Sequence, residues 1–503
     1  MGTSRGIIGI DIGTTSTKSV IFSMEGISLG SSSVEYPLLQ EQPGWAEQEP
    51  DSIVQAVVQS VKGALVQSGL NSGDIAGVGI SSAMHSLIAV DAGGRPLTRS
   101  ITWADSRSEL EARRIREQLE GMAIYRRTGT PIHPMSPLPK LIWLRENRPD
   151  VWEKADKFVS VKEYVLYQLF GEWVVDHSVA SATGLLALDK LDWDEQALAI
   201  AGIGKTKLST LQAGTYRLQG IATHYAEQMG LETSTPFFLG ASDGALANLG
   251  VGAVGAGEIA VTIGTSAAVR MMANKPLTDE QQRTFCYHVA DSSYIIGGAT
   301  NNGGLVLQWL REYLFAGQKS VEELLEAAAK VAPGAGGLLF LPFLTGERAP
   351  IYNAEARGTY FGVNLRHKQE HFVRSGLEGV MLAILSVAEV LVDLAGPARE
   401  IRASGGFAKS PLWLQMLADI LGQEVLVPRV TEASALGAAV LAMQGLGEVN
   451  DWSHIKQWTP IVKRLEPNSH NTEIYRELFG IYQQLNGQLP EHFAAIAEFQ
   501  RKH

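Results

Sequence analysis

Cysteine is nearly absent from this chain. Cys286 is the only cysteine among 503 residues, which excludes an internal disulfide and a zinc cluster built from thiolates. Such low cysteine use is typical of proteins in a reducing compartment. We therefore expect a cytoplasmic protein whose fold depends on its hydrophobic core.

The chain also lacks an excess of positive charge and a long hydrophobic run. Its 42 lysines and arginines are outnumbered by 53 aspartates and glutamates, giving a net charge of −11. The longest apolar stretch, residues 433–443, is shorter than the roughly 20 residues that cross a bilayer. Asp11 interrupts the first apolar run, so no signal-peptide core is formed. We expect neither a nucleic-acid nor a membrane partner, which leaves small molecules as the default ligands.

The length and the patterning of what is present indicate a two-domain α/β protein. A chain of 503 residues with 45% hydrophobic residues exceeds what one core usually serves, so two large domains with a cleft between them are expected. Strand-like segments over 7–23 and 78–91 alternate with helix-like segments over 51–67 and 370–394. This alternation is typical of α/β architecture.

A short sequence repeat occurs once in each half of the chain. Residues Ile10–Ser16 and Val261–Ala267 both consist of a β-branched strand that runs into a Gly-Thr-Thr/Ser turn. Such a turn presents backbone N–H groups and hydroxyls together, which can hold phosphate oxygens. Two facing turns would bind one nucleotide, although either turn alone could be a plain hairpin. The boundary between the halves is predicted near residues 245–257.

Charged residues distinguish the first turn from the second. Asp11 precedes the first turn and Lys18 follows it, whereas Thr262 takes the place of the aspartate in the second. A carboxylate can hold Mg²⁺ through water, and a lysine can contact phosphate. The metal is therefore expected on the side of the first half.

Two further segments have the composition of ligand-binding turns. Ser404–Pro411 places two glycines after a strand and a Ser-Pro pair before a helix, which suits an adenosine or phosphate site or an ordinary strand-to-helix turn. Gly240–Gly244 reads Gly-Ala-Ser-Asp-Gly. It fits a hydrolase nucleophile turn with Ser242 as nucleophile. It also fits a turn that presents Asp243 as a general base for phosphoryl transfer, and only this second interpretation uses the paired phosphate turns.

Three other motif matches are interpreted as structural. Residues 250–255 have dinucleotide-binding spacing but precede a strand instead of following one. Gly204–Thr206 resembles the end of a P-loop but lacks its first glycine. His367 and His371 match a zinc-protease spacing at the polar start of a helix without an evident third ligand.

Together these segments resemble the actin, Hsp70 and sugar-kinase superfamily, and within it the FGGY carbohydrate kinases. Met135–Asn147 looks like the first signature of that family, and Gly358–Val363 with the residues after it looks like the second. Gly376 and Phe407 depart from the usual pattern. The segments that look most like gluconate kinases are residues 81–86, 102–107, 127–134 and 301–304.

This resemblance implies two ribonuclease-H-like domains that close over ATP and Mg²⁺, with a catalytic cleft between them. It implies an N-terminal domain over 5–248, a C-terminal domain over 256–460 and a helical extension over 461–503, and it leaves a homodimer open. Asp243 would be the catalytic base and Asp11 the metal partner. The implied sugar-binding residues are Met84, His85, Trp103, Asp105 and Asp243. The implied nucleotide contacts are Thr14, Thr15, Lys18, Gly264, Thr265, Gly303, Gly405, Gly406 and Lys409.

The expected reaction is transfer of the γ-phosphoryl group of ATP to the terminal hydroxyl of D-gluconate, giving 6-phospho-D-gluconate. Burying the carboxylate of a sugar acid requires a cation or several donors. His85 and the segment Arg127–His133 are the candidates we favour, whereas Arg107 is a weaker candidate and Lys140 is expected to be structural. The alternatives are another kinase of the family, such as a xylulokinase, and an actin- or Hsp70-like ATPase without a sugar substrate.

Overall fold

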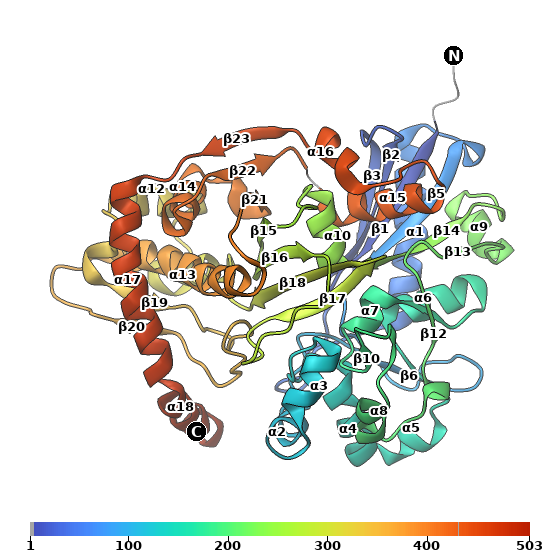
Figure 1. Ribbon diagram of the computed structural model, residues 1–503, viewed down its shortest axis with the longest axis horizontal. Helices are drawn as coiled ribbons and strands as arrows, with labels where there is room; N and C mark the ends of the chain where they lie inside the picture. The colour runs from blue at the N-terminus through green and yellow to red at the C-terminus, as the bar shows by residue number, and fades with distance from the viewer. Residues whose placement is uncertain (1–4, 431) are drawn as a thin grey trace.

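The computed structural model describes residues 5–430 and 432–503. It contains two large β-sheets, each covered by helices, which form two lobes side by side in Figure 1. The first lobe, blue to green, is built from the N-terminal half, and the second, yellow to orange, from the C-terminal half. The expected two-domain α/β architecture is confirmed.

The first sheet has six strands in the order β13-β14-β5-β1-β2-β3. β1 pairs antiparallel with β2 and parallel with β5, so the strand after the first hairpin returns alongside it. The strands are β1 (Gly6–Ile12), β2 (Ser16–Ser23), β3 (Ser28–Glu35), β5 (Ile75–Ser82), β13 (Arg217–Leu218) and β14 (Phe237–Ser242).

The second sheet has seven strands in the order β17-β18-β16-β15-β21-β22-β23. β15 pairs antiparallel with β16 and parallel with β21. The strands are β15 (Glu258–Ile263), β16 (Ala267–Ala273), β17 (Phe285–Ala290), β18 (Ser293–Thr300), β21 (Glu400–Ser404), β22 (Val425–Pro428) and β23 (Ile461–Leu465).

The sequence repeat corresponds to a structural repeat. β1 and β15 occupy the same place in their sheets, each joined by a tight turn to the strand beside it and flanked on the other side by a parallel strand. Each turn is closed by a backbone hydrogen bond of 2.9 Å from its glycine, although the second turn is one residue shorter. Gly13 N–H donates to the Ser16 carbonyl, and Gly264 N–H donates to the Ser266 carbonyl. The two phosphate-type turns are therefore equivalent positions of one duplicated unit.

Helices cover the faces of both sheets, and the remaining strands form short two-stranded ladders. The helices of the N-terminal half are α1 (Pro50–Ser68), α2 (Glu109–Gln118), α3 (Gly121–Thr128), α4 (Pro137–Asn147), α5 (Pro149–Lys154), α6 (Val161–Phe170), α7 (His177–Ser181), α8 (Glu195–Ala201), α9 (Thr223–Met229) and α10 (Asp243–Gly250). The later helices are α11 (Leu305–Phe315), α12 (Val321–Ala329), α13 (Gln369–Ala395), α14 (Pro411–Leu421), α15 (Ala433–Gly445), α16 (Ile455–Trp458), α17 (Ser469–Gln488) and α18 (Pro490–Lys502). The ladders are formed by β4 (Glu47–Gln48), β6 (Ile88–Val90), β7 (Ser100–Ile101), β8 (Lys157–Val159), β9 (Val174–Asp176), β10 (Leu186–Ala187), β11 (Asp192–Trp193), β12 (Thr210–Gln212), β19 (Leu339–Leu341) and β20 (Thr359–Phe361).

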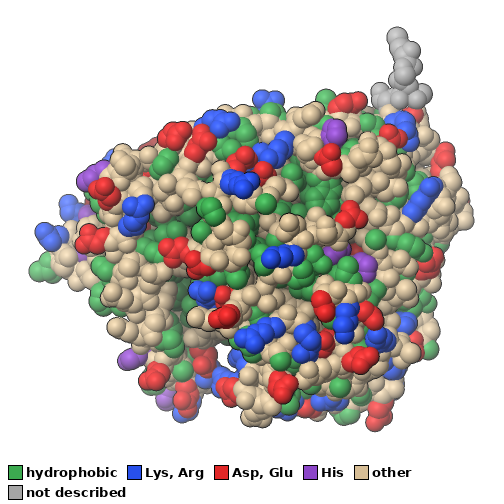
Figure 2. Space-filling view, in the orientation of Figure 1, with side chains coloured by type: hydrophobic (Ala, Val, Ile, Leu, Met, Phe, Trp, Pro, Cys, Tyr) green, Lys and Arg blue, Asp and Glu red, His purple; other side chains and the backbone are tan. Residues whose placement is uncertain are grey.

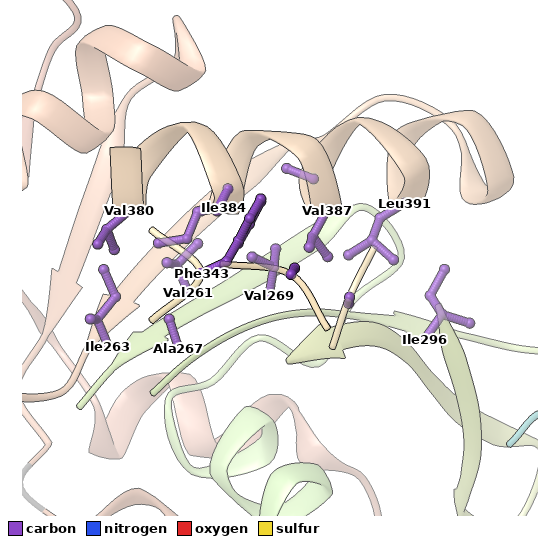
Figure 3. Packing of buried hydrophobic residues seen from close by; sticks show 14 of the residues in the cluster. Val261, Ile263, Ala267, Val269, Ile296, Phe343, Val380, Ile384, Val387 and Leu391 are labelled. Carbon is purple, nitrogen blue, oxygen red and sulfur yellow. The ribbon is translucent and has the colours of Figure 1, made fainter. Parts of the chain in front are cut away.

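The core of the second lobe forms between α13 and its sheet. Figure 3 shows Val380, Ile384, Val387 and Leu391 of α13 directed toward residues of the sheet. These helix positions are three or four residues apart, which puts them on one face of the helix. The sheet contributes Val261, Ile263, Ala267, Val269 and Ile296. The long helix expected over 370–394 is thus a core helix that supports β15 and β16 from the side away from the first lobe.

Helix α15 lies on the first sheet, although in the chain it stands between β22 and β23 of the second. A Cβ at Gly9 of β1 would come within 1.9 Å of the Ala435 carbonyl oxygen, and a Cβ at Gly79 of β5 within 2.0 Å of the Ala438 oxygen. Only glycine lets the helix backbone come this close to the sheet. The predicted C-terminal domain, 256–460, therefore includes a helix that belongs by packing to the first lobe.

The predicted helical extension, 461–503, also needs correction. Its first five residues form β23, the edge strand of the second sheet, which pairs antiparallel with β22. Helices α17 and α18 follow, and both lie along the outer side of the second lobe in Figure 1. The extension is helical only from Ser469 onward.

Acidic and basic side chains are interspersed over the face shown in Figure 2, without a broad area of one sign. Among the described residues, no helix combines the length and the hydropathy required to span a membrane.

Candidate active site

A cavity of about 250 Å³ lies between the two lobes, where the turn-bearing strands of both sheets meet. Its volume is slightly below the range of about 300–1,000 Å³ common for drug-sized ligands, which suits a small metabolite. The first half contributes Thr14, Met84, His85, Trp103, Met135 and Asp243 to its wall. The second half contributes Ser266, Ala267, Ala268, Arg270, Phe285, Tyr287, Ala299, Arg348 and Tyr352.

Asp243 is the only carboxylate among the residues that line the cavity. It is the first residue of α10, directly after β14, and its Oδ1 accepts a hydrogen bond of 2.6 Å from the Gly244 N–H. Burial raises the pKa of Asp243, and the positive charges of Arg270 and Arg348 oppose this rise. A carboxylate with a raised pKa is a better proton acceptor than an ordinary surface aspartate.

The alternative nucleophile, Ser242, is turned away from the cavity. Its side chain is fully buried, and its hydroxyl lies 3.0 Å from the hydroxyl of Ser178. A hydrolase nucleophile must be exposed at its turn and must reach a general base. Ser242 meets neither condition, so the hydrolase interpretation of this turn is wrong.

Asp11 is a second carboxylate near Asp243 but outside the cavity wall. It accepts a hydrogen bond of 2.8 Å from Ser81. Burial and the charge of Asp243 raise the pKa of Asp11 to about 7. Two neighbouring carboxylates, Asp11 and Asp243, form a donor set whose mutual repulsion a divalent cation would relieve. Among the described residues, no cluster of three or more acidic, histidine or cysteine side chains forms a ready-made metal site.

The first phosphate-type turn carries Thr14 and Thr15. The Thr14 hydroxyl accepts a hydrogen bond of 2.8 Å from the indole N–H of Trp103, which ties the turn to the sugar side of the cavity. Thr15 is exposed, so its hydroxyl is open to a ligand. Lys18, a predicted phosphate contact, instead forms an ion pair with Glu432. Phosphate would have to compete with that carboxylate for the ammonium group.

The second turn carries Gly264 and Thr265, both exposed. Gly303 supports this turn from behind, because its N–H donates to the Thr265 carbonyl at 3.0 Å. A Cβ at Gly303 would come within 2.6 Å of the Ser266 carbonyl oxygen, whereas a Cβ at Gly264 would meet no atom within 4 Å. Gly264 therefore faces open space, and Gly303 shapes the turn.

The Gly-Gly segment lies beside the second turn. Gly405 follows β21, and a Cβ there would come within 2.4 Å of the Ile263 carbonyl oxygen, one residue before Gly264. Gly405, Gly406 and Lys409 are exposed, and none of them lines the cavity. Phe407, which departs from the usual family pattern, is buried in the core. Its side chain therefore does not occupy the exposed surface at Gly405 and Gly406. Ser410 caps α14 as predicted, because its side chain accepts from the Trp413 N–H.

On the sugar side, Met84, His85 and Trp103 reach the cavity as expected. His85 Nδ1 lies 2.7 Å from the Ala182 carbonyl oxygen, which can only accept a hydrogen bond, so Nδ1 carries the proton. Burial, with the charge of Lys140 next in importance, lowers the pKa of His85 to about 3. His85 is therefore neutral at working pH, and the expectation that it supplies positive charge for a carboxylate is wrong.

Asp105 does not reach the cavity. Both of its carboxylate oxygens are taken up, by the guanidinium group of Arg107 and by the N–H of Ala46. Arg107 also pairs with Glu47 and lies over the ring of Trp45 at 3.5 Å. Asp105 and Arg107 are thus held by partners within the protein and neither lines the cavity. A substrate contact of Asp105 stays a prediction.

The other predicted cations also have partners elsewhere. Arg127 pairs with Asp194 at 2.6 Å, outside the cavity wall. Burial keeps the pKa of His133 well below its usual value, and its Nδ1 accepts from the Met135 N–H. The Lys140 ammonium donates to the carbonyls of His85, Thr102 and Met135, each at 2.7 Å. Lys140 is therefore structural, as expected, because it joins three segments of the wall.

Sequence reasoning missed two arginines that line the cavity, Arg270 and Arg348. Arg270 is the single charged residue within the apolar strand β16. This isolation is the feature of the sequence that could have identified it as a functional residue. Arg348 lies in the connection between β19 and β20, where no periodic pattern marks it. Both come from the second half, whereas the predicted sugar contacts all came from the first.

The interpretation of His367 and His371 as structural agrees with the geometry. Nδ1 of His367 accepts from the Asn364 N–H, and Nδ1 of His371 accepts from the Lys368 N–H. Nε2 of His367 lies 3.1 Å from the Gly336 carbonyl oxygen and must donate to it, so His367 has no free lone pair for zinc. Among the described residues, no third ligand gathers around the pair.

Comparison with known proteins agrees with this geometry. The models for the N-terminal and C-terminal domains of the FGGY family of carbohydrate kinases match residues 6–250 and 259–446. The chain therefore belongs to the FGGY family of carbohydrate kinases.

Individual relatives are similar over almost the whole chain. A gluconokinase from Bacillus subtilis (strain 168) is 44% identical over 98% of this chain and 98% of its own. A crystal structure of a gluconate kinase from Lactobacillus acidophilus superposes with a TM-score of 0.94 at 35% identity, covering 98% of this chain and 100% of that one. A ligand-bound structure from the same organism, described as a xylulose kinase, gives the same TM-score, identity and coverage.

Proposed function

We propose that this protein phosphorylates D-gluconate at its terminal hydroxyl, with ATP as donor, and releases 6-phospho-D-gluconate and ADP. The observation that carries the proposal is the wall of the cavity, where Asp243 lies together with two arginines. A general base and an anion-attracting surface in one small cavity suit a substrate that is both an alcohol and an acid. The 44% identity to a gluconokinase supports the same substrate.

The reaction requires few chemical groups from the protein. The terminal hydroxyl oxygen of gluconate forms a bond to the γ-phosphorus while the bond from that phosphorus to the β,γ-bridging oxygen breaks. The hydroxyl proton passes to the Asp243 carboxylate, and ADP leaves with the bridging oxygen. Because phosphoryl transfer depends mainly on positioning and charge stabilisation, the two turns and the base are sufficient protein parts.

The paired turns are proposed to hold the donor. The exposed backbone and hydroxyl groups of Thr15, Gly264 and Thr265 support phosphate contacts. The exposed Gly405–Gly406 surface beside the second turn supports an adenosine site, with Lys409 at its edge.

Mg²⁺ is proposed to bind on the side of Asp11. The buried Asp11 carboxylate, whose pKa is raised to about 7, fits a cation held there directly or through water. When bound, Mg²⁺ supplies positive charge that stabilises the transferring phosphoryl group.

One substrate panel tests the proposal. ADP release should be measured with gluconate, xylulose, ribulose, glycerol, glucose and no sugar, each at several concentrations. We expect kcat/KM to be highest for gluconate and ADP release without sugar to be near background. The highest kcat/KM with a neutral sugar would overturn the proposal.

A ketose kinase is the second candidate. The similarity to a structure described as a xylulose kinase favours it. With a neutral ketose, however, Asp243 would be the only anionic group in the cavity wall opposite two arginines. The same panel decides between the two substrates. Sugar-independent ADP release with sedimenting polymers would instead indicate an actin-like ATPase.

A further inference from the structure

The charge of the cavity wall does not match a neutral sugar. Arg270 and Arg348 contribute two positive charges, Asp243 contributes one negative charge, and His85 is neutral. Among the ion pairs within 4 Å in the described part of the chain, none involves Arg270 or Arg348. The residues that line the cavity therefore carry an excess of positive charge in a chain whose net charge is −11, although the buried Glu347 carboxylate lies next to Arg348 outside the lining.

Arg270 has hydrogen-bond donors without partners. Its Nε and Nη1 atoms are buried and make no hydrogen bond among the described residues. Leaving buried donors of a charged group unpaired is unfavourable, and a bound acceptor would remove this cost. An unpaired guanidinium at a cavity wall thus indicates a ligand that accepts hydrogen bonds.

The surrounding backbone makes room for Arg270. Its side chain leaves β16 on the same face as Ala268, two residues earlier, and opposite the core-facing Val269. A Cβ at Gly297, paired with Arg270 across the sheet, would lie 3.1 Å from its Cγ. A Cβ at Gly244 would lie 3.0 Å from its Nε. Glycine at both positions leaves space for the arginine to enter the cavity.

Arg348 is held in place by neighbours that leave part of its guanidinium free. Its Nε donates to Asn301 at 2.8 Å, and its Nη2 donates to the Thr300 carbonyl at 3.2 Å. Its guanidinium carbon lies 4.6 Å from the centre of the Trp103 ring. The residue is 9% exposed, and Nη1 has no hydrogen-bond partner among the described residues. Arg348 is thus oriented in advance, with a donor available to a ligand in the cavity.

We propose that Arg270 and Arg348 together bind the carboxylate of the sugar acid and select it over a neutral sugar of the same length. This inference rests on the proposed function and names the residues that determine its substrate class. Guanidinium groups bind carboxylates through several parallel hydrogen bonds, so two of them recognise an anion strongly. A neutral polyol would leave the unpaired donors of both guanidinium groups without an acceptor of opposite charge in the ligand, which adds discrimination against it.

A different role for Arg270 has to be distinguished by experiment. The positive charge of Arg270 acts on the Asp243 carboxylate and lowers its pKa. From this position near the proposed base, Arg270 could instead stabilise charge on the phosphoryl group, as arginines do in other phosphoryl transferases. That role would lower turnover equally for acid and neutral substrates. Carboxylate binding would lower it mainly for the acid.

The test uses Arg270→Met in the full-length protein. We measure kcat/KM for gluconate, kcat/KM for D-xylulose, and the inhibition constant of D-glucitol, a neutral polyol of the same length as gluconate. We expect kcat/KM for gluconate to fall about 10- to 100-fold, the usual effect of losing a charged hydrogen bond. The values for xylulose and glucitol should change less than about threefold, and the KM for ATP should not rise.

Further variants separate binding from folding. Arg348→Lys keeps the charge but cannot make the same parallel hydrogen bonds, and it should give a smaller loss that is again confined to the acid. Arg283→Met is the matched control, because Arg283 pairs with Asp279 in the same half of the chain but outside the cavity. It should leave all three constants unchanged. Thermal melts establish that each variant is folded.

Equal losses for gluconate and the neutral compounds in Arg270→Met would overturn this inference and leave the proposed function intact. A wild-type protein that prefers a neutral ketose to gluconate would overturn both. The two failures are therefore distinguishable.

Discussion

The two halves of the chain present the same turn with different charges around it. In the first half, Asp11 lies opposite Lys18 across the β1–β2 hairpin, beside the turn. In the second half, Thr262 lies opposite Ala268 across the β15–β16 hairpin. The only charged residue of β16 is Arg270, two residues farther along the strand. The first hairpin thus carries an aspartate and a lysine beside its turn, whereas β16 of the second hairpin carries an arginine and no acid.

This difference indicates a division of tasks between the halves. The first hairpin, with a buried carboxylate, is suited to a cation and to the phosphoryl donor. The turn of the second hairpin has no charged residue, and the guanidinium group of Arg270 lines the cavity. That group is suited to bind an anionic substrate. Equivalent positions in a repeated fold therefore need not have equivalent functions.

The largest effect is expected at the base. Asp243→Asn keeps the shape of the side chain but removes the proton acceptor, so kcat should fall by roughly 10² to 10⁴. Nucleotide affinity should stay within about twofold, since phosphate contacts are proposed at the turns. Steady-state kinetics and titration with a nonhydrolysable ATP analogue measure these two effects.

Ser242→Ala is the control for that variant. The Ser242 hydroxyl contacts only its buried neighbour Ser178, so a small stability loss and near-normal turnover are expected. A loss in Ser242→Ala as large as that in Asp243→Asn would restore the nucleophile interpretation.

The next largest effect concerns Asp11, whose pKa is raised to about 7. Below that pH a proton competes with Mg²⁺ for the carboxylate, so the Mg²⁺ concentration that gives half-maximal rate should rise up to about tenfold per pH unit. Asp11→Asn should show a higher Mg²⁺ requirement, a lower kcat and no such pH dependence. A wild-type Mg²⁺ requirement that is constant from pH 6 to pH 8 would contradict the assignment.

The same pKa predicts an effect on folding with a definite sign. Because folding raises the pKa of Asp11 above its usual value of 3.8, the folded state holds a proton that the unfolded state releases. Without Mg²⁺, its contribution to the free energy of unfolding is present below pH 4 and is lost as the pH rises through about 7. Denaturant melts of wild type and Asp11→Asn across this range should converge toward low pH and diverge toward neutral pH, with the wild type becoming less stable.

A smaller effect is expected from adding one methyl group to each turn. At Gly264 a Cβ meets no atom within 4 Å, so Gly264→Ala should fold normally and raise the KM for ATP several-fold by filling phosphate space. At Gly13 a Cβ would lie 3.0 Å from the Ser16 carbonyl oxygen, so Gly13→Ala should also lower the melting temperature. Unchanged ATP kinetics in Gly264→Ala would exclude that turn from the donor site.

The smallest expected signal is a change of shape. If the lobes close over both substrates, small-angle scattering should show a slightly smaller radius of gyration with gluconate and a nonhydrolysable ATP analogue together than with either alone. An unchanged radius with both ligands would show that the cavity forms without closure.

Local patterns were sufficient for much of the fold. The hairpin repeat, the core helix α13 and the Ser410–Pro411 helix start all depend on residues near one another in sequence, and all were predicted. The position of α15 was not, because its contact with Gly9 and Gly79 joins segments from opposite ends of the chain.

Charged side chains were predicted less well for the same reason. Arg127, Asp105 and Lys18 were all expected at ligands, and each has a partner in the protein. The partners of Arg127 and Lys18 are far away in sequence, and no periodicity marks them. Arg348 was missed because no local pattern marks an arginine in a long connection, and Arg270 was missed although it is the single charged residue of an apolar strand.

The packing of α15 on the first sheet also has a consequence for synthesis. The strands β1 and β5 are complete once Ser82 has been made, but the helix that covers one of their faces ends at Gly445. At a synthesis rate of about 5–20 residues per second, that face of the sheet stays uncovered for on the order of 20–70 s. During this time the apolar side chains of Ile7 and Val20, later buried against α15, remain accessible on the ribosome. We therefore expect the N-terminal half, expressed alone, to need a chaperone or to aggregate, whereas supplying α15 in trans should improve its yield.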